Sequence, residues 1–326
     1  MRAWQVVRHG EPDVALELAD SSLPPPGPRE LNIRVIASGL ALPDVLQCRG
    51  AYPIKPAMPF TPGLEFVGEV VAAGPDTATP VGARVMGVSA LITTGKGAFA
   101  EQCRAAERTT YPVPAGMSDA EAAAFTIAYH TAHVGLVRRA RLQEGETVLV
   151  HGAAGGTGFA AVQLAKALGA RVIATAGGPA KVKTCLDLGA DVAIDYAAAD
   201  FVAEVMSATG GRGADIVYDP VGGEVFERSV QCIAREGRLL PIGYASGRWG
   251  MVAPNELAWR NAAIVGVLPT GFMRSDMLDM HAHLSRLYES GAIRVAVDRK
   301  ISFAEIPAGL MEVAGRRVQG RIVALH

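Results

Sequence analysis

Four glycines lie within seven residues in the stretch VLVHGAAGGTGFAAVQLAKALGARVIAT, which spans residues 148–175. An apolar run precedes these glycines and an alanine-rich, helix-forming run follows them, so they fall at a turn from a strand to a helix. Glycine permits a tight bend there and lets the backbone approach a ligand closely. Free N–H groups at the start of the next helix attract phosphate. The pattern predicts a dinucleotide-phosphate site, with a purely structural turn as the alternative.

The register of the cluster is Ala153-x-Gly155-x-x-Gly158, so an alanine stands at the first glycine position of the dinucleotide fingerprint. We expect Gly155 to form the turn, Gly156 to leave room for the diphosphate and Gly158 to let the helix pack on the sheet. The N–H of Thr157 belongs to the first helical turn and faces the same phosphates. No Lys-Ser/Thr pair follows the glycines, which argues against a nucleoside triphosphatase.

The residues after the second strand indicate which dinucleotide is bound. An NAD site usually carries Asp or Glu there, about twenty residues after the glycines, to hold the ribose 2′-hydroxyl. Here the chain reads Thr175-Ala-Gly177-Gly-Pro-Ala-Lys181, with no carboxylate. A 2′-phosphate would be repelled by an acid and attracted by Lys181, so these residues favour NADPH over NADH. The alternative for Lys181 is an ordinary solvated surface lysine.

The elements around this motif alternate between strands and helices. We predict strands at 147–150, 171–175, 192–195, 215–219, 238–243 and 263–268, separated by helical stretches, as in a parallel dinucleotide-binding sheet. The first 120 or so residues instead carry short β-rich runs separated by proline and glycine, at 1–7, 31–37, 66–74 and 82–88. A helix is expected near 275–290, followed by short strands at 293–297, 301–303 and 320–325 that rejoin the first domain. The fold class is therefore α/β, with a second, β-rich domain.

The composition sets limits on the partners. The chain has 326 residues, 50% of them hydrophobic and 19% charged, with a formal net charge of −1. This length favours two domains, and the absence of a basic excess argues against nucleic acid and anionic membranes as partners. We expect no membrane span and a cytoplasmic location. The four cysteines are widely spaced and indicate buried thiols rather than disulfides or a zinc cage.

Several motifs along the chain resemble the zinc-free, zeta-crystallin-like quinone oxidoreductases of the medium-chain dehydrogenase/reductase superfamily. They are GLALPDVLQCRGAYPIKPAMPFTPGLEFVGEV, GAFAEQC, VHGAAGGTGFAAVQLAKALGARVIATAG, LGADVAIDY, GRGADIVYDPVGG, GRLLPIGYASG and RRVQGRIV. The resemblance implies a GroES-like catalytic domain at residues 1–122 and 272–326, and a Rossmann domain with a six-stranded sheet at 123–271. It also implies a homodimer and an NADPH-dependent reaction with a quinone or other conjugated carbonyl acceptor, bound where the two domains face each other.

Site residues are carried over from the same resemblance. Lys181, Tyr196 and Arg316 stand at the family's positions for holding the 2′-phosphate, which agrees with the charge argument above. The expected coenzyme contacts are Ala154, Gly155, Gly156, Thr157, Gly158, Thr175, Gly177, Lys181, Tyr196, Val221, Gly243, Tyr244, Val267, Leu268 and Arg316. Taken alone, Tyr196 is equally well explained as a half-buried aromatic and Arg316 as a surface charge.

The chain differs from the related alcohol dehydrogenases that bind zinc. Gly63-Leu64-Glu65 stands where their catalytic site has Gly-His-Glu, and VMGVSALITTGKGAFAE stands where they have a lobe of four cysteines. We therefore expect no zinc, because imidazole and thiolate are the ligands that such sites use. His130 and His133, one helical turn apart, have no nearby third ligand in the sequence.

The chain also differs from the family at the residues that contact the substrate. Ala41 and Leu46 replace the Asn and Tyr that commonly steer the acceptor in quinone oxidoreductases, so quinone specificity is not secured by the sequence. Candidate hydrogen-bond donors to the substrate oxygen are Tyr52, Thr126 and Tyr129, each of which has packing as its alternative role. An enoyl- or 2-alkenal-type double-bond reductase and a non-catalytic NADPH-binding protein remain open alternatives.

Overall fold

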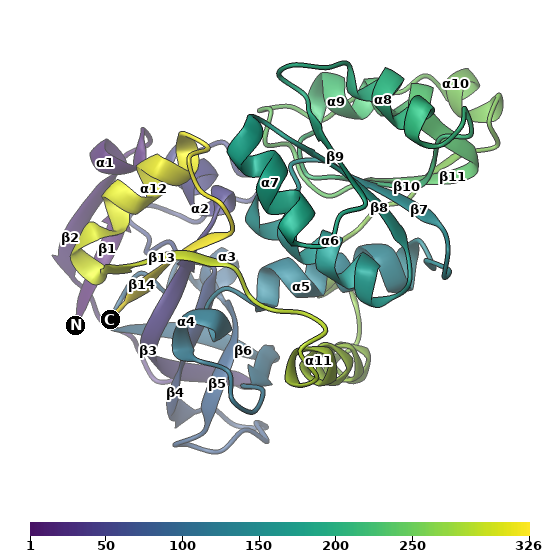
Figure 1. The fold of residues 1–326 in the computed structure, drawn as a ribbon. Coiled ribbons are helices and arrows are strands. Elements are labelled where there is room, and N and C mark those ends of the chain that lie inside the picture. Colours follow the sequence, from purple (N-terminus) through teal and green to yellow (C-terminus); the bar gives the residue numbers. More distant parts are fainter. The chain divides into compact units, whose positions relative to one another are not determined.

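The computed structural model describes all residues from 1 to 326, which form two compact units. Unit 1 comprises Met1–Ile127, Met273–Ser285 and Val295–His326, and unit 2 comprises Ala128–Phe272 and Arg286–Arg294. Figure 1 shows both, coloured along the chain. Each unit is described separately below.

Unit 1 is built on antiparallel strands. Its larger sheet has the order β13-β14-β3-β4-β5-β6, and β6 also pairs with β3, so that β3 to β6 close into a barrel. The C-terminal strand β14 pairs with β3, with Val323 opposite Gly39. A separate β1–β2 pair completes the unit. The strands are β1 (Arg2–Val6), β2 (Leu16–Asp20), β3 (Glu30–Leu40), β4 (Glu65–Ala73), β5 (Arg84–Ser89), β6 (Gln102–Pro112), β13 (Val297–Ser302) and β14 (Arg321–Leu325).

Helices connect these strands. The core between them includes Val45, Leu91, Phe99, Leu310 and Ile322, all with side chains at most 1% exposed. The helices are α1 (Pro12–Ala15), α2 (Leu42–Cys48), α3 (Leu91–Thr94), α4 (Asp119–Ala122), α12 (Ile306–Ala314) and most of α11 (Arg274–Glu289). Helix α5 (Thr126–His133) begins at the end of this unit and continues into the next.

Unit 2 contains a six-stranded parallel sheet. Its order is β12-β11-β10-β7-β8-β9, which counted along the chain is 6-5-4-1-2-3, the order of a doubly wound dinucleotide-binding fold. The strands are β7 (Thr147–Val150), β8 (Arg171–Ala176), β9 (Val192–Asp195), β10 (Ala214–Asp219), β11 (Ile233–Pro241) and β12 (Ala263–Ile264). The predicted α/β class, with a β-rich and a doubly wound part, is therefore confirmed.

Helices cover both faces of the parallel sheet. In Figure 1, α6 (Gly156–Ala167) and α7 (Pro179–Asp187) lie on one side of the strands, while α8 (Phe201–Ala208) and α9 (Gly223–Ser229) lie on the other. The strands between them are apolar on both faces, as burial on both sides requires. Helix α10 (Pro254–Ala258) precedes β12, and a π-helical segment, Val134–Arg139, continues α5.

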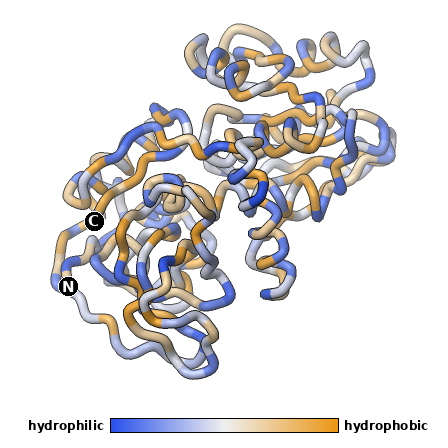
Figure 2. The backbone as a smooth tube through the Cα atoms, turned by 60° about the horizontal axis from the view of Figure 1, so that its bottom comes forward, coloured by the Kyte–Doolittle hydropathy of each residue, from blue (hydrophilic) through white to orange (hydrophobic).

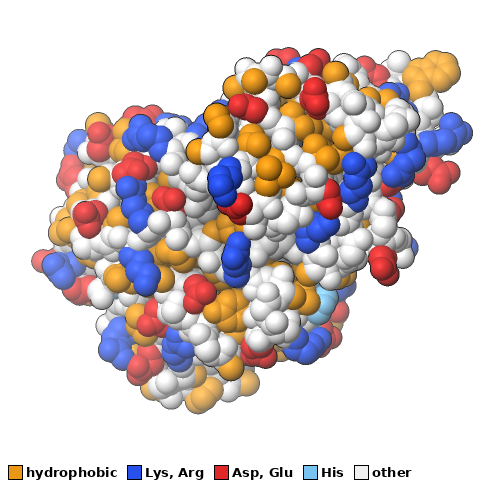
Figure 3. Space-filling view, viewed as in Figure 1, with side chains coloured by type: hydrophobic (Ala, Val, Ile, Leu, Met, Phe, Trp, Pro, Cys, Tyr) orange, Lys and Arg blue, Asp and Glu red, His pale blue; other side chains and the backbone are white.

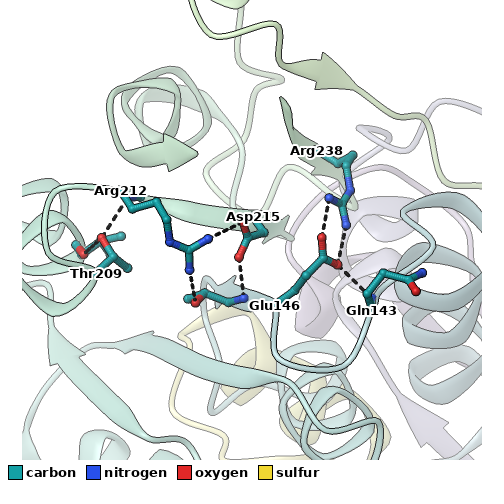
Figure 4. A network of polar contacts seen from close by, with 9 residues as sticks. Gln143, Glu146, Thr209, Arg212, Asp215 and Arg238 are labelled. Atoms are coloured by element: carbon teal, nitrogen blue, oxygen red, sulfur yellow. Dashed lines mark hydrogen bonds and ion pairs between the residues drawn. The ribbon is translucent and has the colours of Figure 1, made fainter. Parts of the chain in front are cut away.

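A network of charged residues links the amino ends of β7 and β10 to the middle of β11 (Figure 4). Arg212 pairs with Asp215 of β10, whose other oxygen accepts the N–H of Thr147 at the start of β7, with a distance of 2.7 Å. Arg238 of β11 makes a two-pronged contact with Glu146, with distances of 2.8 and 2.7 Å. In open α/β sheets of this kind, ligands bind at the carboxyl ends of the strands.

Three predicted strands differ from the structure, and two strands, β2 and β6, were not predicted. The fifth strand of unit 2 covers 233–241 rather than 238–243. The sixth strand of unit 2 covers only 263–264, not 263–268, because Arg139 Nε takes the carbonyl of Gly266 at 2.9 Å and the chain leaves the sheet there. In unit 1, the strand predicted at 293–297 begins at Val297 and continues to Ser302, where it pairs with β14. The run 293–296 is largely apolar, but it lies outside the sheet.

The surface and the helices are consistent with the composition. No helix has both the length and the apolar content needed to cross a bilayer. Figure 2 shows apolar and polar residues interspersed along the chain. On the face drawn in Figure 3, positive and negative side chains are interspersed without a large patch of one sign.

Candidate dinucleotide-binding site

The glycine cluster forms a turn between β7 and α6. Gly152 has a φ of +57°, in the left-handed region that favours glycine, and the N–H of Gly155 closes the turn on the Gly152 carbonyl at 2.9 Å. Gly155 is the N-cap of α6 and has no side chain to bind the first N–H groups of the helix. Those groups are left for a ligand, and the first turn carries no acidic residue that would repel phosphate.

Gly158 allows the helix to lie directly on this turn. A Cβ atom at position 158 would come within 2.4 Å of the Gly152 carbonyl oxygen and 2.7 Å of the Ala153 Cα. Only glycine fits so close an approach, as the fingerprint requires. Ala153 and Ala154 are buried beneath the turn.

A second loop borders the turn. Asp219, the last residue of β10, is fully buried and accepts the N–H groups of Val221 at 2.7 Å and Gly222 at 3.2 Å. Burial raises the pKa of Asp219 to about 6, against the lowering effect of these two hydrogen bonds. The loop so fixed places Val221 beside Gly152: a Cβ on Gly152 would be 3.5 Å from a methyl group of Val221.

The expected 2′-phosphate residues of unit 2 gather after β8 and β9. A Cβ on Gly177 would lie 2.7 Å from the Tyr196 hydroxyl oxygen, so the tyrosine ring covers this glycine while remaining 53% exposed. The N–H of Gly178 donates to Asp195 at 2.9 Å, and α7 begins at the next residue with Lys181 in its first turn. Arg316 lies in unit 1, exposed after α12 with a φ of +56°.

The side chain of Thr175 is directed into the interior of unit 2. Its side chain is only 2% exposed, and its hydroxyl lies 3.0 Å from Nδ1 of His151. Its carbonyl accepts the N–H of Ala153 at 3.0 Å. The hydroxyl thus points toward the interior of unit 2, so any contact of residue 175 with a coenzyme has to come from its backbone.

Four further residues expected to contact the coenzyme follow β11 and β12 in the chain. Gly243 follows β11 closely, with its N–H directed at the Asp219 carbonyl at 3.3 Å, and the ring of Tyr244 lies 4.7 Å from that of Trp249. Val267 and Leu268 line a hollow of about 490 Å³, together with Arg139, Trp249 and Phe272. All of these residues belong to unit 2.

The three candidate hydrogen-bond donors have different surroundings. Tyr129 is 2% exposed, and its hydroxyl donates to the Arg294 carbonyl at 2.6 Å and accepts from Gln163 at 2.8 Å. The hydroxyl proton of Tyr129 is already used in the hydrogen bond to the Arg294 carbonyl, so we do not assign Tyr129 as a donor to the substrate oxygen. Tyr52 is half-buried and lines a small hollow of unit 1. The Thr126 hydroxyl is buried and has no hydrogen-bond partner within the protein.

A buried charge cluster holds the backbone around Thr126. Glu65 forms an ion pair with Arg321 and accepts the Ile127 N–H at 2.9 Å. Burial raises the pKa of Glu65, and Arg321 opposes this shift. Asp44, also fully buried, accepts the N–H groups of Ala41 and Leu64, and burial raises the pKa of its carboxyl to about 7. The cluster stabilises the start of α5 in unit 1.

The histidines do not gather with other ligands. No three His, Cys, Asp or Glu side chains lie close enough together to hold a metal ion. His130 and His133 are 2% and 8% exposed on α5. His281 stacks on Tyr111 at 4.8 Å, and burial lowers its pKa to about 4.

Sequence reasoning did not single out His151 and Asp219 in unit 2, or the Glu65–Arg321 pair in unit 1. His151 lies between the glycine turn and β8, and Asp219 shapes the loop beside that turn. Because β7 and β10 are buried on both faces, no alternation of polar and apolar residues marks either side chain as inward-facing. The Glu65–Arg321 pair joins residues far apart in the chain, so no local pattern signals it.

Comparison with known proteins agrees with this geometry. The chain matches the family model described as alcohol dehydrogenase GroES-like domain at residues 27–115, and the one described as zinc-binding dehydrogenase at 156–286. It is 35% identical to a quinone oxidoreductase of Pseudomonas aeruginosa over 98% of both chains.

Two solved structures are similar over their whole length. A mycobacterial protein in complex with NADPH has a TM-score of 0.91 and 34% identity, with full coverage of both chains. The Escherichia coli quinone oxidoreductase in complex with NADPH has a TM-score of 0.92 and 28% identity, again with full coverage of both. The chain therefore belongs to the quinone oxidoreductase family of the medium-chain dehydrogenase/reductase superfamily.

Proposed function

We propose that this protein is an NADPH-dependent oxidoreductase that reduces a quinone or other conjugated carbonyl compound. The observation that carries the proposal is the uncapped start of α6, packed through Gly158 onto the glycine turn. Backbone N–H groups free of acidic neighbours are suited to a diphosphate. The similarity to NADPH-bound quinone oxidoreductases supports the same coenzyme.

The residues after β8 and β9 select the phosphorylated coenzyme in this proposal. Lys181 supplies positive charge and Tyr196 a hydroxyl beside Gly177, where an NAD site would present a carboxylate. Arg316 is proposed as a third contact of the 2′-phosphate. Val221, Gly243, Tyr244, Val267 and Leu268 are proposed to line the remainder of the coenzyme site.

For the reaction itself, the reduced coenzyme supplies the hydride. The chain has to stabilise the negative charge that develops on the acceptor oxygen, which needs a hydrogen-bond donor or water. The Thr126 hydroxyl, buried and without a protein partner, is the donor we propose, with Tyr52 as a further candidate. Glu65 and Arg321 hold the Thr126–Ile127 backbone in place.

The proposal is tested by following NADPH oxidation with 1,4-benzoquinone, 1,2-naphthoquinone, an alkyl enone and crotonyl-CoA. We expect turnover with the quinones and a preference for NADPH over NADH. Turnover limited to the enone or the thioester would identify a double-bond reductase instead. Binding of NADPH without turnover of any acceptor would favour a non-catalytic role.

We also propose that the reaction is independent of zinc. Leu64 occupies the position where a histidine ligand would be expected. Asp44, which accepts the Leu64 N–H, and Glu65, the next residue in the chain, are already bound to backbone N–H groups and Arg321. Activity that survives prolonged dialysis against a chelator is the expected result. Loss of activity on dialysis, with recovery on adding zinc, would refute this part.

A homodimer formed through the edge strand β12 is a further part of the proposal. Ile264 on this strand is 42% exposed, and in the same unit Met251 and Trp259 are 83% and 78% exposed. Unpaired backbone groups on an edge strand together with exposed apolar side chains favour pairing with a second copy. We expect a dimer in sedimentation and a monomer for Ile264→Asp; a monomeric native protein would contradict this.

The proposed roles of the two domains use the domain limits predicted from the sequence. Residues 1–122 and 272–326 are proposed as the GroES-like catalytic domain, and residues 123–271 as the NADPH-binding domain. All four cysteines are buried free thiols, which supports a reducing, cytoplasmic location.

A further inference from the structure

His151 is a buried polar residue with no part in the function proposed so far. It directly follows β7 and precedes Gly152, and only 1% of its side chain is exposed. Its Nδ1 lies 3.0 Å from the Thr175 hydroxyl and its Nε2 lies 2.9 Å from the Ser229 hydroxyl. The edge of the ring packs against Phe201, with the ring centres 4.9 Å apart.

The hydrogen bonds determine which ring nitrogen carries the proton. The Ser229 hydroxyl donates its one proton to the Val225 carbonyl at 2.7 Å, so toward His151 it acts as an acceptor. Nε2 of His151 therefore carries the hydrogen. Nδ1 is then an acceptor, and it takes the hydroxyl proton of Thr175. Burial lowers the pKa of His151 to about 3, so the ring is neutral at physiological pH.

These contacts connect the glycine turn with the end of β8, the two parts of the coenzyme site that are proposed to bind phosphate. On one side of His151, the next residues form the glycine turn that receives the diphosphate. On the other side, Thr175 leads within a few residues to Gly177 and Lys181. The backbone adds a parallel link, because the Ala153 N–H donates to the Thr175 carbonyl at 3.0 Å. The His151 ring is the side-chain connection between the turn and the end of β8.

We propose that His151 is a positioning residue for coenzyme selection. It sets the distance between the glycine turn at 152–158, the diphosphate seat, and the residues after β8 at 177–181, the 2′-phosphate seat. This inference rests on the proposed function. NADPH has to engage both seats at once, and the benefit of the second contact depends on its distance from the first. NADH lacks the 2′-phosphate, so it gains less from the residues after β8. Loosening the link between His151 and Thr175 therefore weakens NADPH binding more than NADH binding.

The first test removes the Thr175 hydroxyl while keeping the shape of the side chain. Thr175→Val leaves Nδ1 of His151 without its donor, and Thr175→Ser restores a hydroxyl at the same position. Calorimetry with NADPH and NADH gives the ratio of the two affinities for each variant. We expect this ratio to fall about three- to tenfold in Thr175→Val, the range of a lost hydrogen bond, and to recover in Thr175→Ser. Equal weakening of both coenzymes, or no change in the ratio, would overturn the proposal.

A second measurement uses the unaltered protein and does not depend on a variant that folds. Nitrogen-15 NMR of the histidine rings distinguishes the two neutral tautomers. We expect His151 to show the Nε2–H form, with no titration between pH 5 and 8. The Nδ1–H form, or titration in this interval, would refute the geometry on which the inference stands.

The probes 2′,5′-ADP and 5′-AMP separate failure of this inference from failure of the proposed function. If the native protein binds neither NADPH nor 2′,5′-ADP, the coenzyme assignment itself is wrong. If it binds 2′,5′-ADP more tightly than 5′-AMP, and Thr175→Val keeps that difference unchanged, only the role of His151 is refuted.

Discussion

The carboxylate of Glu65 forms an ion pair with Arg321, two residues separated by most of the chain but both almost fully buried in unit 1. The same carboxylate also accepts the N–H of Ile127 at the start of α5. A strand of the barrel, the C-terminal strand and the helix that carries Thr126 thus meet at one buried charge pair. Removing either charge leaves the other without compensation.

We predict that Arg321→Met destabilises the protein by about 3–5 kcal/mol, because it leaves the Glu65 charge buried and unpaired. Urea unfolding measures the change. The double variant Glu65→Gln/Arg321→Met is expected to regain part of the loss. As a matched control, Arg34→Met breaks the exposed pair with Glu69 and costs at most about 1 kcal/mol. Similar losses in Arg321→Met and Arg34→Met would contradict the importance of burial.

Lys181→Ala should lower the affinity for NADPH about tenfold and leave that for NADH nearly unchanged, since only the 2′-phosphate meets this cation. Calorimetry with the two coenzymes gives both values. The control is Lys183→Ala on the same helix, whose ammonium pairs with Asp187 instead. If the two lysine variants behave alike, Lys181 has no special part in coenzyme binding.

Gly158→Ala is expected to destabilise unit 2 by about 1–3 kcal/mol, because the new Cβ would overlap the Gly152 carbonyl at 2.4 Å. Thermal unfolding and NADPH binding should decline together, since the same contact shapes the phosphate-binding turn. Gly266→Ala is the matched substitution, with no atom within 4 Å of its added Cβ. If Gly158→Ala proves as stable as the native protein, the turn adapts to the extra methyl group.

The contribution of His281 to the unfolding free energy should fall as the pH is lowered from 6.5 toward 4. Burial lowers the pKa of His281 from 6.5 to about 4, so the unfolded chain takes up a proton in this interval that the folded protein refuses. The full stability from this residue is present above pH 6.5, and about 3 kcal/mol is lost by pH 4.

His281→Gln keeps a donor for the Pro112 carbonyl but does not titrate. Urea unfolding as a function of pH should therefore give a shallower decline for this variant than for the native protein. His9→Gln, at an exposed position, serves as the control. An unchanged slope in His281→Gln would mean that other groups cause the acid sensitivity.

The sequence by itself determined the architecture of the coenzyme-binding unit. Strands at 147–150 and 192–195 are found with the predicted limits, and the glycine turn lies between β7 and α6 as its spacing indicates. These features are local: apolar runs bounded by glycine form strands, and an alanine-rich run after a turn forms a helix. The missing acid and the lysine after β8 are likewise visible in a few consecutive residues.

The tertiary structure decided the roles of residues whose partners are distant in the chain. The hydroxyl of Thr175 faces His151, and the proton of Tyr129 goes to the Arg294 carbonyl. The sixth strand stops at Ile264 because Arg139, more than a hundred residues earlier, takes the Gly266 carbonyl. A buried hydrogen bond depends on which groups the fold brings within about 3 Å, and local sequence patterns carry no record of that distance.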